Sequence, residues 1–247
     1  MLGRATDFEF RYRFWVIMAI FAAGFWCYRF DPVNAGMAFA GWLAGHRLEL
    51  DRLGDRHLLQ GVCALAAALA VLAALVRTWG AAYLRSDVVH DLDLHTEGLV
   101  ADGPYRYVRN PLYLGGVLLA LSLGILASRL GFLVLVAGLT LFYNRLIGHE
   151  EALLLETQGE PYRRFLAAVP RLVPSLRPRL PAGGMKPRWG QAWLGEAPMW
   201  IMACSVIAFA ATLKPQVFYS VIGIALVGYA IRIAVVARRK RAAAAEQ

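Results

Sequence analysis

The chain has 247 residues, of which 59% are hydrophobic and only 17% are charged, and its formal net charge is +9. Apolar residues in such excess, gathered in long runs, fit an integral membrane protein better than a soluble domain. The sequence contains no RNA- or DNA-binding motif, so the basic excess predicts contact with anionic lipid headgroups and no nucleic-acid partner.

Six apolar stretches predict transmembrane helices, since about 20 mostly apolar residues cross the hydrocarbon core of a bilayer. In chain order they cover residues 14–30, 58–77, 112–127, 130–147, 197–213 and 216–237. Residues 34–45 are also apolar but too few to span alone, and they predict an interfacial or half-inserted helix. The expected fold class is therefore all-α, a polytopic integral membrane protein with about six transmembrane helices.

The distribution of positive charge predicts the orientation of these helices. Basic residues are dense before the first span, between the fourth and fifth spans and after the last, whereas the opposite turns carry fewer. The positive-inside rule then places both termini, and the loops before the third span and after the fourth, in the cytoplasm. A bacterial inner membrane is the expected location, and the first apolar run is expected to be a retained anchor.

The chain divides into three parts. Residues 1–85 form an N-terminal pair of spans, and residues 86–178 hold two polar motifs with the hairpin of the third and fourth spans between them. Residues 179–247 begin with a linker rich in proline and glycine and add two spans. Trp189 and Trp193, among the cations of that linker, predict an anchor at headgroup level.

The first polar motif runs from Gly103 to Tyr113 with the sequence GPYRYVRNPLY. Pro111 suits the first turn of a helix, and Asn110 suits its N-cap. The motif thus predicts a helix N-terminus at the membrane surface with Arg106 and Arg109 beside it, which is a natural anion site. An ordinary capped helix whose arginines reach the headgroups is the alternative interpretation.

The second polar motif begins at His149-Glu150-Glu151 and ends at Val169-Pro170-Arg171. Neighbouring residues on a helix point about 100° apart, so Glu150 and Glu151 cannot share one role. One is expected to face the site and the other water or Arg145, although a solvated helix end is an alternative. The segment 150–168 predicts an amphipathic surface helix that is interrupted at residues 159–161 and ends before Pro170.

Other chemistries find little support in the sequence. The run from His90 to His95 offers four possible metal ligands, but no second ligand pair has metal-site spacing, so no metal is expected. There is no GxSxG, no P-loop and no GxGxxG between a strand and a helix, so soluble hydrolase and nucleotide-binding folds lack support. Cys27, Cys63 and Cys204 lie in separate apolar runs and predict buried free thiols.

Taken in order, the motifs resemble the isoprenylcysteine carboxyl methyltransferase family, including its bacterial members, and the related phospholipid N-methyltransferases. The resemblance covers about Leu94 to Pro174 and is carried by GPYRYVRNPLY, a helical hairpin, HEEALLL and GEPYRRFLAAVPRLVP. It implies S-adenosylmethionine as the methyl donor, bound in a cofactor pocket on the cytoplasmic face. Asn110 departs from the family pattern, in which histidine is frequent, and cannot fill a role that needs an ionisable imidazole.

The resemblance also implies which residues form the site. The donor contacts would be His90, Glu97, Gly98, Leu99, Val100, Tyr105, Asn110, Pro111, Leu112, Tyr113, Glu150 and Glu151. Arg145 is the candidate for orienting the substrate, and Glu150 and Arg109 complete the expected catalytic set. The tyrosine rings can cover adenine or face the sulfonium, a glutamate suits the ammonium or the ribose diol, and an arginine suits the carboxylate.

The expected acceptor is a lipophilic small molecule or prenylated substrate in contact with membrane lipid. An isoprenylcysteine-type carboxylate is favoured because it needs no general base, and no convincing base is present. Phospholipid N-methylation is the alternative acceptor chemistry. A membrane reductase using NADPH is disfavoured because such reductases carry an arginine-aspartate-aspartate motif where this chain has His149-Glu150-Glu151. A non-enzymatic scaffold or transporter is the third hypothesis, and the oligomeric state is left open.

Overall fold

The computed structural model describes residues 3–84, 101–225 and 227–228. Regular structure in these residues is helical, without strands. The elements are α1 (Asp7–Arg11), α2 (Arg13–Trp26), η1 (Cys27–Arg29), α3 (Ala35–Ala44), α4 (Leu53–Tyr83), η2 (Gly103–Arg106), α6 (Pro111–Leu126), α7 (Arg129–Gln158), α8 (Glu160–Ala168), α9 (Trp189–Gly195), α10 (Ala197–Thr212) and a last helix, Pro215–Ala225. The all-α prediction is confirmed for this part of the chain.

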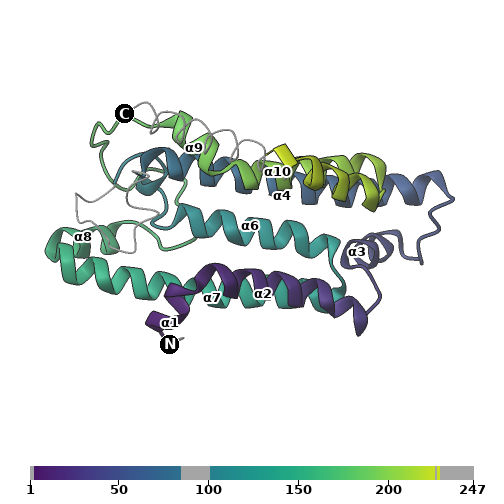
Figure 1. Ribbon diagram of the computed structural model, residues 1–247. Coiled ribbons are helices and arrows are strands. Elements are labelled where there is room, and N and C mark those ends of the chain that lie inside the picture. The colour runs from purple at the N-terminus through teal and green to yellow at the C-terminus, as the bar shows by residue number, and fades with distance from the viewer. Residues whose placement is uncertain (1–2, 85–100, 226, 229–247) are drawn as a thin grey trace, which may run out of the picture.

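The long helices form three layers (Figure 1). α4 packs with α9 and α10 in one layer, α6 lies in the middle, and α7 packs with α2 on the other side. α6 contacts both α4 and α7, so it is the centre of the bundle. Many large apolar side chains on the outer surface are exposed, among them Trp15, Trp26 and Leu133. A soluble monomer rarely exposes so much apolar surface, whereas lipid-facing helices do.

All six predicted stretches contain helix, but fewer are long enough to count as spans. Among the described residues, α4 and α7 can each cross a membrane by length and composition, and the pair α9 and α10, bent by 61°, adds a third if it is one span. α3, α6 and Pro215–Ala225 are apolar but shorter. The structure thus supports an integral membrane protein with two or three candidate spans, and a total of six stays a prediction.

One predicted boundary is wrong. The fourth span was expected to end at residue 147 and a separate surface helix to begin at 150, yet α7 continues unbroken to Gln158. A single glycine, Gly148, costs a helix interior only about 1 kcal/mol, so nothing there ends the helix. The expected interruption at 159–161 is confirmed, because Gly159 has φ +61° and α8 starts at Glu160. α8 ends at Ala168, before Val169-Pro170, as expected.

The turn between α6 and α7 is fixed by the segment that precedes α3. The Asn34 amide donates to the carbonyl oxygen of Leu126 (2.9 Å), and the Tyr28 hydroxyl donates to the same oxygen (2.8 Å). Ser128 caps α7 by accepting from the N–H of Gly131 (3.0 Å). These bonds satisfy carbonyl and N–H groups at helix ends that would otherwise lack partners. They hold α6 and α7 as a hairpin whose open end carries the two polar motifs.

Small residues let α2 and α7 approach closely, and Gly131 is the tightest point. A β-carbon at Gly131 would overlap the carbonyl oxygen of Gly24. We expect Gly131→Ala to lower the free energy of unfolding by about 1–3 kcal/mol, because backbone must shift to admit it. Gly61→Ala is the matched control, since nothing lies within 4 Å of the added carbon. Equal unfolding midpoints for the two variants in detergent would contradict the close packing.

Candidate functional site

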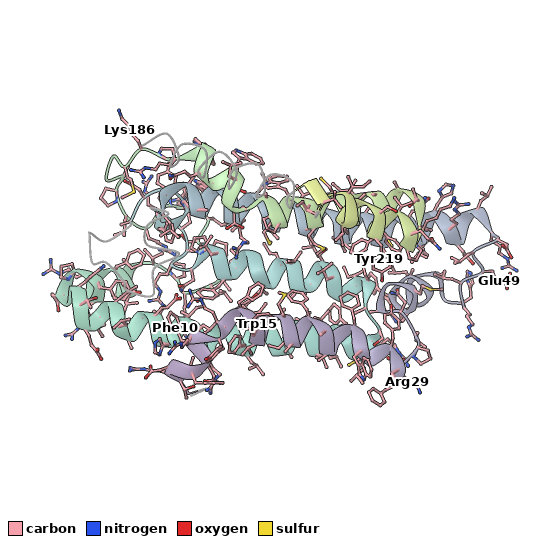
Figure 2. The ribbon with its side chains drawn as sticks, in the orientation of Figure 1. Phe10, Trp15, Arg29, Glu49, Lys186 and Tyr219 are labelled. Atoms are coloured by element: carbon pink, nitrogen blue, oxygen red, sulfur yellow. The ribbon has the colours of Figure 1, made fainter. Side chains whose placement is uncertain are left out.

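Both polar motifs lie at one end of the bundle, which we call the motif end. It contains α1, η2, α8 and the linker, defined here as residues 170–188 (Figure 1). Figure 2 shows Phe10 and Lys186 toward this end, and Arg29 and Glu49 at the opposite end. The hairpin of α6 and α7 therefore brings together two motifs that are far apart in the sequence, with Tyr113 and Glu150 separated by 37 positions.

The centre of the motif end is a hydrogen bond between the two motifs. The Tyr113 hydroxyl, in the first turn of α6, donates to Oε1 of Glu150 on α7 at 2.7 Å. The ring of Tyr143 lies beside Tyr113, with centroids 5.4 Å apart. Glu150 faces this side because it continues the buried stripe of α7 that contains Tyr143 and Leu146. A carboxylate held by a phenol among aromatic rings is well suited to a cationic or hydroxyl-bearing ligand.

Tyr105 belongs to the same environment. It is buried in η2, and burial, followed by the charge of Glu150, raises the pKa of its phenol above the usual range. The phenol therefore stays protonated and can donate a hydrogen bond. Gly103 makes this position possible, because its φ of +56° and its contact with the Tyr83 ring leave no room for a β-carbon. The structure thus brings Tyr105, Tyr113 and Glu150 together.

Arg109 and Glu151 form a second, separate cluster with Arg171. Nε of Arg109 lies 3.3 Å from Oε1 of Glu151, and Nη2 of Arg171 lies 3.1 Å from Oε2. Arg109 also donates to the carbonyl oxygen of Leu166 on α8 (2.7 Å). Glu150 and Glu151 therefore face different partners, as their spacing predicts. The charge of Glu151 is met by two guanidinium groups rather than by water or Arg145.

Asn110 occupies the N-cap position of α6, but its side chain does not cap the helix. Its amide instead donates to the carbonyl oxygen of Arg171 (3.0 Å), and α6 has no side-chain cap hydrogen bond. The predicted helix start at Pro111 is confirmed, whereas the predicted capping bond is wrong. The linker competes for the Asn110 side chain, so the first N–H groups of α6 keep their capacity to bind an anion.

Pro111 and Leu112 lie at the start of α6 on the side toward α4. A β-carbon built at Gly80 of α4 would lie 3.2 Å from Cγ of Pro111 and 3.1 Å from Cδ2 of Leu112. Arg77 of α4 donates to the carbonyl oxygen of Leu112 (3.2 Å). Their side chains therefore pack between helices, and any donor contact at these two positions would be made by backbone.

Arg145 lies on a different side of α7 from Glu150. Nη2 of Arg145 pairs with Glu9 of α1 at 2.7 Å, and this hydrogen bond lowers the pKa of Glu9. A substrate-orienting role for Arg145 stays a prediction, and in this structure its partner is the N-terminal segment. The remaining predicted donor contacts are His90, Glu97, Gly98, Leu99 and Val100, and they lie outside the described residues.

The linker lies along the first motif in antiparallel direction. The N–H of Arg109 donates to Pro170, that of Ser175 to Tyr107, and that of Arg179 to Arg106. The Asp102 carboxylate then accepts from the N–H groups of Gly183 (2.7 Å) and Met185 (2.8 Å). These bonds order a proline- and glycine-rich segment that has no helix of its own, and they cover the first motif.

We expect Asp102→Ala to loosen the linker without unfolding the bundle. Bonds from Met185 and Gly183 lower the pKa of Asp102, so the contact persists across neutral pH and is lost only as pH falls through that lowered value. Trypsin should therefore cut the variant faster than the parent after Arg179 and Arg188, by a ratio that is constant across neutral pH. The control Asp51→Ala changes a residue at the opposite end and should be cut by trypsin at the same rate as the parent. Unchanged cleavage in Asp102→Ala would refute this role.

Several residues of this end were not among the predicted site residues. Glu9 is one, and the pattern Thr6-Asp7-Phe8-Glu9 is a capping-box signal that predicts α1 and fixes Glu9 near α7. Arg77 of α4 forms a bidentate pair with Glu196, the residue that joins α9 to α10. An arginine at the end of an apolar run was the sequence signal that could have identified this pair. Among the described residues, no three His, Cys, Asp or Glu side chains gather as a metal site.

Comparison with protein families gives a match over part of the chain. Residues 62–160 match the model of a family described as phospholipid methyltransferase. The match runs from α4 through both α6 and α7 and ends at the start of α8, so it contains the Tyr113–Glu150 pair. This family belongs to the same group of membrane methyltransferases as the isoprenylcysteine carboxyl methyltransferases, which confirms the resemblance seen in the sequence. Searches of curated proteins and of solved structures returned no match.

Proposed function

We propose, because residues 62–160 match a family of this group of membrane methyltransferases, that the protein transfers a methyl group from S-adenosylmethionine to a lipophilic acceptor. The observation that carries the proposal is the Tyr113–Glu150 hydrogen bond of 2.7 Å, which joins the two motifs at the motif end. When bound, the donor supplies an activated methyl group on a sulfonium.

The residues of the motif end fit the groups of such a donor. The α6 N-terminus has no side-chain cap, so its N–H groups are suited to the donor carboxylate. Glu150 is suited to the ammonium or the ribose hydroxyls, and the rings of Tyr105, Tyr113 and Tyr143 to adenine or the sulfonium. His90 and residues 97–100 complete the proposed donor set from outside the described residues.

The chain's own contribution to the reaction would be alignment and exclusion of water. Methyl transfer is an in-line displacement, so holding donor and acceptor in one line supplies most of what catalysis needs. Tyr113 orients Glu150, Glu150 orients the donor, and the linker covers the first motif through Asp102. None of these roles requires a protein group to become covalently attached to the methyl group.

For the acceptor we favour a carboxylate of the isoprenylcysteine type. A carboxylate attacks through a lone pair and loses no proton, so it needs no base. Arg145 of α7, which pairs with Glu9, and Arg109, which pairs with Glu151, are cations of the motif end that would attract it. Phospholipid N-methylation is the second candidate, favoured by the match of residues 62–160 to a family described as phospholipid methyltransferase.

The test is methyl transfer by the purified protein in lipid nanodiscs, with methyl-labelled S-adenosylmethionine. An N-acylated S-prenylcysteine and phosphatidylethanolamine are offered separately. Label that is released from product by mild base as methanol identifies a methyl ester, and label stable to base in a lipid identifies a methylamine. Absence of label from both acceptors and from total lipid extract would contradict the proposal. NADPH binding without donor binding would instead favour a reductase.

A further inference from the structure

A cavity of about 590 Å³ lies against a face of α7 that the proposed donor site does not use. Asn144, Gly148 and Leu155 of α7 form one wall, and Arg4, Leu166 of α8 and Arg171 of the linker form the others. The volume is within the range of roughly 300–1,000 Å³ that small-molecule sites occupy. Glu150 does not line it, because its side chain faces Tyr113.

The N-terminal segment is fixed as a wall of this cavity. The N–H of Ala5 donates to the carbonyl oxygen of Arg145 (3.0 Å), and Nδ1 of His149 lies 3.1 Å from the carbonyl oxygen of Ala5. The ring of Phe10 stacks on His149 with centroids 4.6 Å apart. Ala5 itself is buried. Arg4 is therefore held at the edge of the cavity by its neighbour, rather than by an ion pair of its own.

Arg4 and Arg171 both lie beside Gly148. A β-carbon built at Gly148 would lie 3.4 Å from Nη2 of Arg171 and 3.6 Å from Cγ of Arg4. These two side chains come from opposite parts of the sequence, and at Gly148 α7 has no side chain between them. Gly148 thus leaves the space in which a ligand could contact both.

The charge around the cavity is positive and incompletely matched. Glu151 is its one acidic lining residue, and two arginines, Arg109 and Arg171, already pair with it. Arg4 makes no ion pair with any described residue. Nε of Arg171 is buried and lacks a hydrogen-bond partner among the described residues. The Arg171 side chain is 37% exposed, so its guanidinium group is open to an anion, and a charge-assisted hydrogen bond to that anion would stabilise the fold.

We propose that this cavity binds a phosphate group, with Arg4 and Arg171 as its anion ligands. The planar guanidinium group matches phosphate oxygens with paired hydrogen bonds. The Asn144 amide already donates to the carbonyl oxygen of Thr140 (2.9 Å), and Leu155 and Leu166 provide an apolar wall. Both an anionic phospholipid and free phosphate carry the required group, and the apolar wall is suited to the glycerol region of a lipid. The site goes beyond methyl transfer and does not depend on it.

The experiment measures the unfolding midpoint of the full-length protein in an uncharged detergent. Short-chain phosphatidylglycerol, diacylglycerol of the same chain length and inorganic phosphate are added separately at matched ionic strength. A ligand that binds only the folded state raises the midpoint with concentration. Two variants disrupt the site in different ways: Arg4→Gln removes a positive charge, and Gly148→Leu fills the space with a side chain. Arg47→Gln, an exposed arginine at the opposite end, and Gly148→Ala are the matched controls.

We expect phosphatidylglycerol to stabilise the parent more than diacylglycerol does. Arg4→Gln and Gly148→Leu should each need about 10-fold more of it for the same shift, which corresponds to about 1.4 kcal/mol. Arg47→Gln and Gly148→Ala should respond as the parent does. If inorganic phosphate alone gives the same pattern, the phosphate site stands and free phosphate is its source. Equal shifts in all variants would overturn the proposal, as would a parent that neither phosphatidylglycerol nor inorganic phosphate stabilises more than diacylglycerol does.

Donor binding separates this proposal from the proposed function. S-adenosylmethionine binding by calorimetry should be the same in Gly148→Leu and the parent, because Gly148 lies on another face of α7 from Glu150. A parent that binds phosphatidylglycerol but no S-adenosylmethionine would retain the phosphate site and contradict the methyltransferase. The reverse result would retain the methyltransferase and contradict the phosphate site.

Discussion

Glu150→Gln is expected to reduce kcat/KM for methyl transfer by roughly 10- to 100-fold. Hydrogen bonds to a charged group contribute about 1.5–3 kcal/mol, and the variant removes the charge that would hold the donor's ammonium or ribose. Tyr113→Phe should give a smaller loss, because it removes only the 2.7 Å bond that orients Glu150. The measurement is the initial rate of label transfer at several donor concentrations, together with the donor dissociation constant by calorimetry.

Glu156→Gln is the control for this prediction, since Glu156 lies on the same helix and is exposed. It should keep the parent rate, because an exposed carboxylate two turns away from the aromatic cluster touches no donor. A loss in Glu156→Gln equal to that in Glu150→Gln would mean that α7 as a whole, rather than the Glu150 side chain, is sensitive. Full activity in Glu150→Gln would remove Glu150 from the site.

Glu196→Gln is expected to lower the free energy of unfolding by about 3–5 kcal/mol, the largest effect on stability that we predict. Glu196 is buried and accepts two bonds from Arg77, at 2.6 Å from Nε and 2.9 Å from Nη2. Removing one partner leaves the charge of Arg77 unpaired between helices. The pair, with the Trp200–Thr78 hydrogen bond of 3.0 Å, holds α10 against α4. The measurement is unfolding in mixed micelles with increasing denaturing detergent.

The double variant Arg77→Met with Glu196→Met tests whether the loss comes from the unpaired charge. Replacing a whole buried pair by apolar groups of similar volume is often neutral, so the double variant should recover much of the lost stability. Glu160→Gln is the surface control, because its pairs with Arg163 and Arg164 are exposed and 3.7 Å long. It should change the free energy of unfolding by less than about 0.5 kcal/mol. A double variant as unstable as Glu196→Gln would contradict this explanation.

Much of the helical layout could be predicted from the sequence, because it depends on local signals. Apolar runs located every long helix, and Gly159-Glu160-Pro161 located the break between α7 and α8. The spacing of Glu150 and Glu151 predicted that they face different partners. The length of α7 could not be predicted in this way, because its charged last turns contact the N-terminal segment and the linker, and such distant contacts leave no periodic signal.

The partners of the charged residues were the part least visible in the sequence. Arg109 was expected in the catalytic set and Glu151 among the donor contacts, and in the structure these two side chains pair with each other, while Arg109 also donates to α8. Asn110 has the residue type and position of a cap, but the backbone of the linker takes its amide. Arg145 pairs with Glu9, more than 100 residues earlier. Each of these outcomes depends on which distant segment the fold brings near, and a local pattern cannot report that.

The most direct test of the central claim is calorimetric titration of the purified protein with S-adenosylmethionine. We predict saturable binding at one site per chain, weakened by Glu150→Gln and unchanged by Glu156→Gln. Binding that is absent from a folded parent protein, or present with equal affinity in Glu150→Gln, would contradict a donor site built on the Tyr113–Glu150 pair.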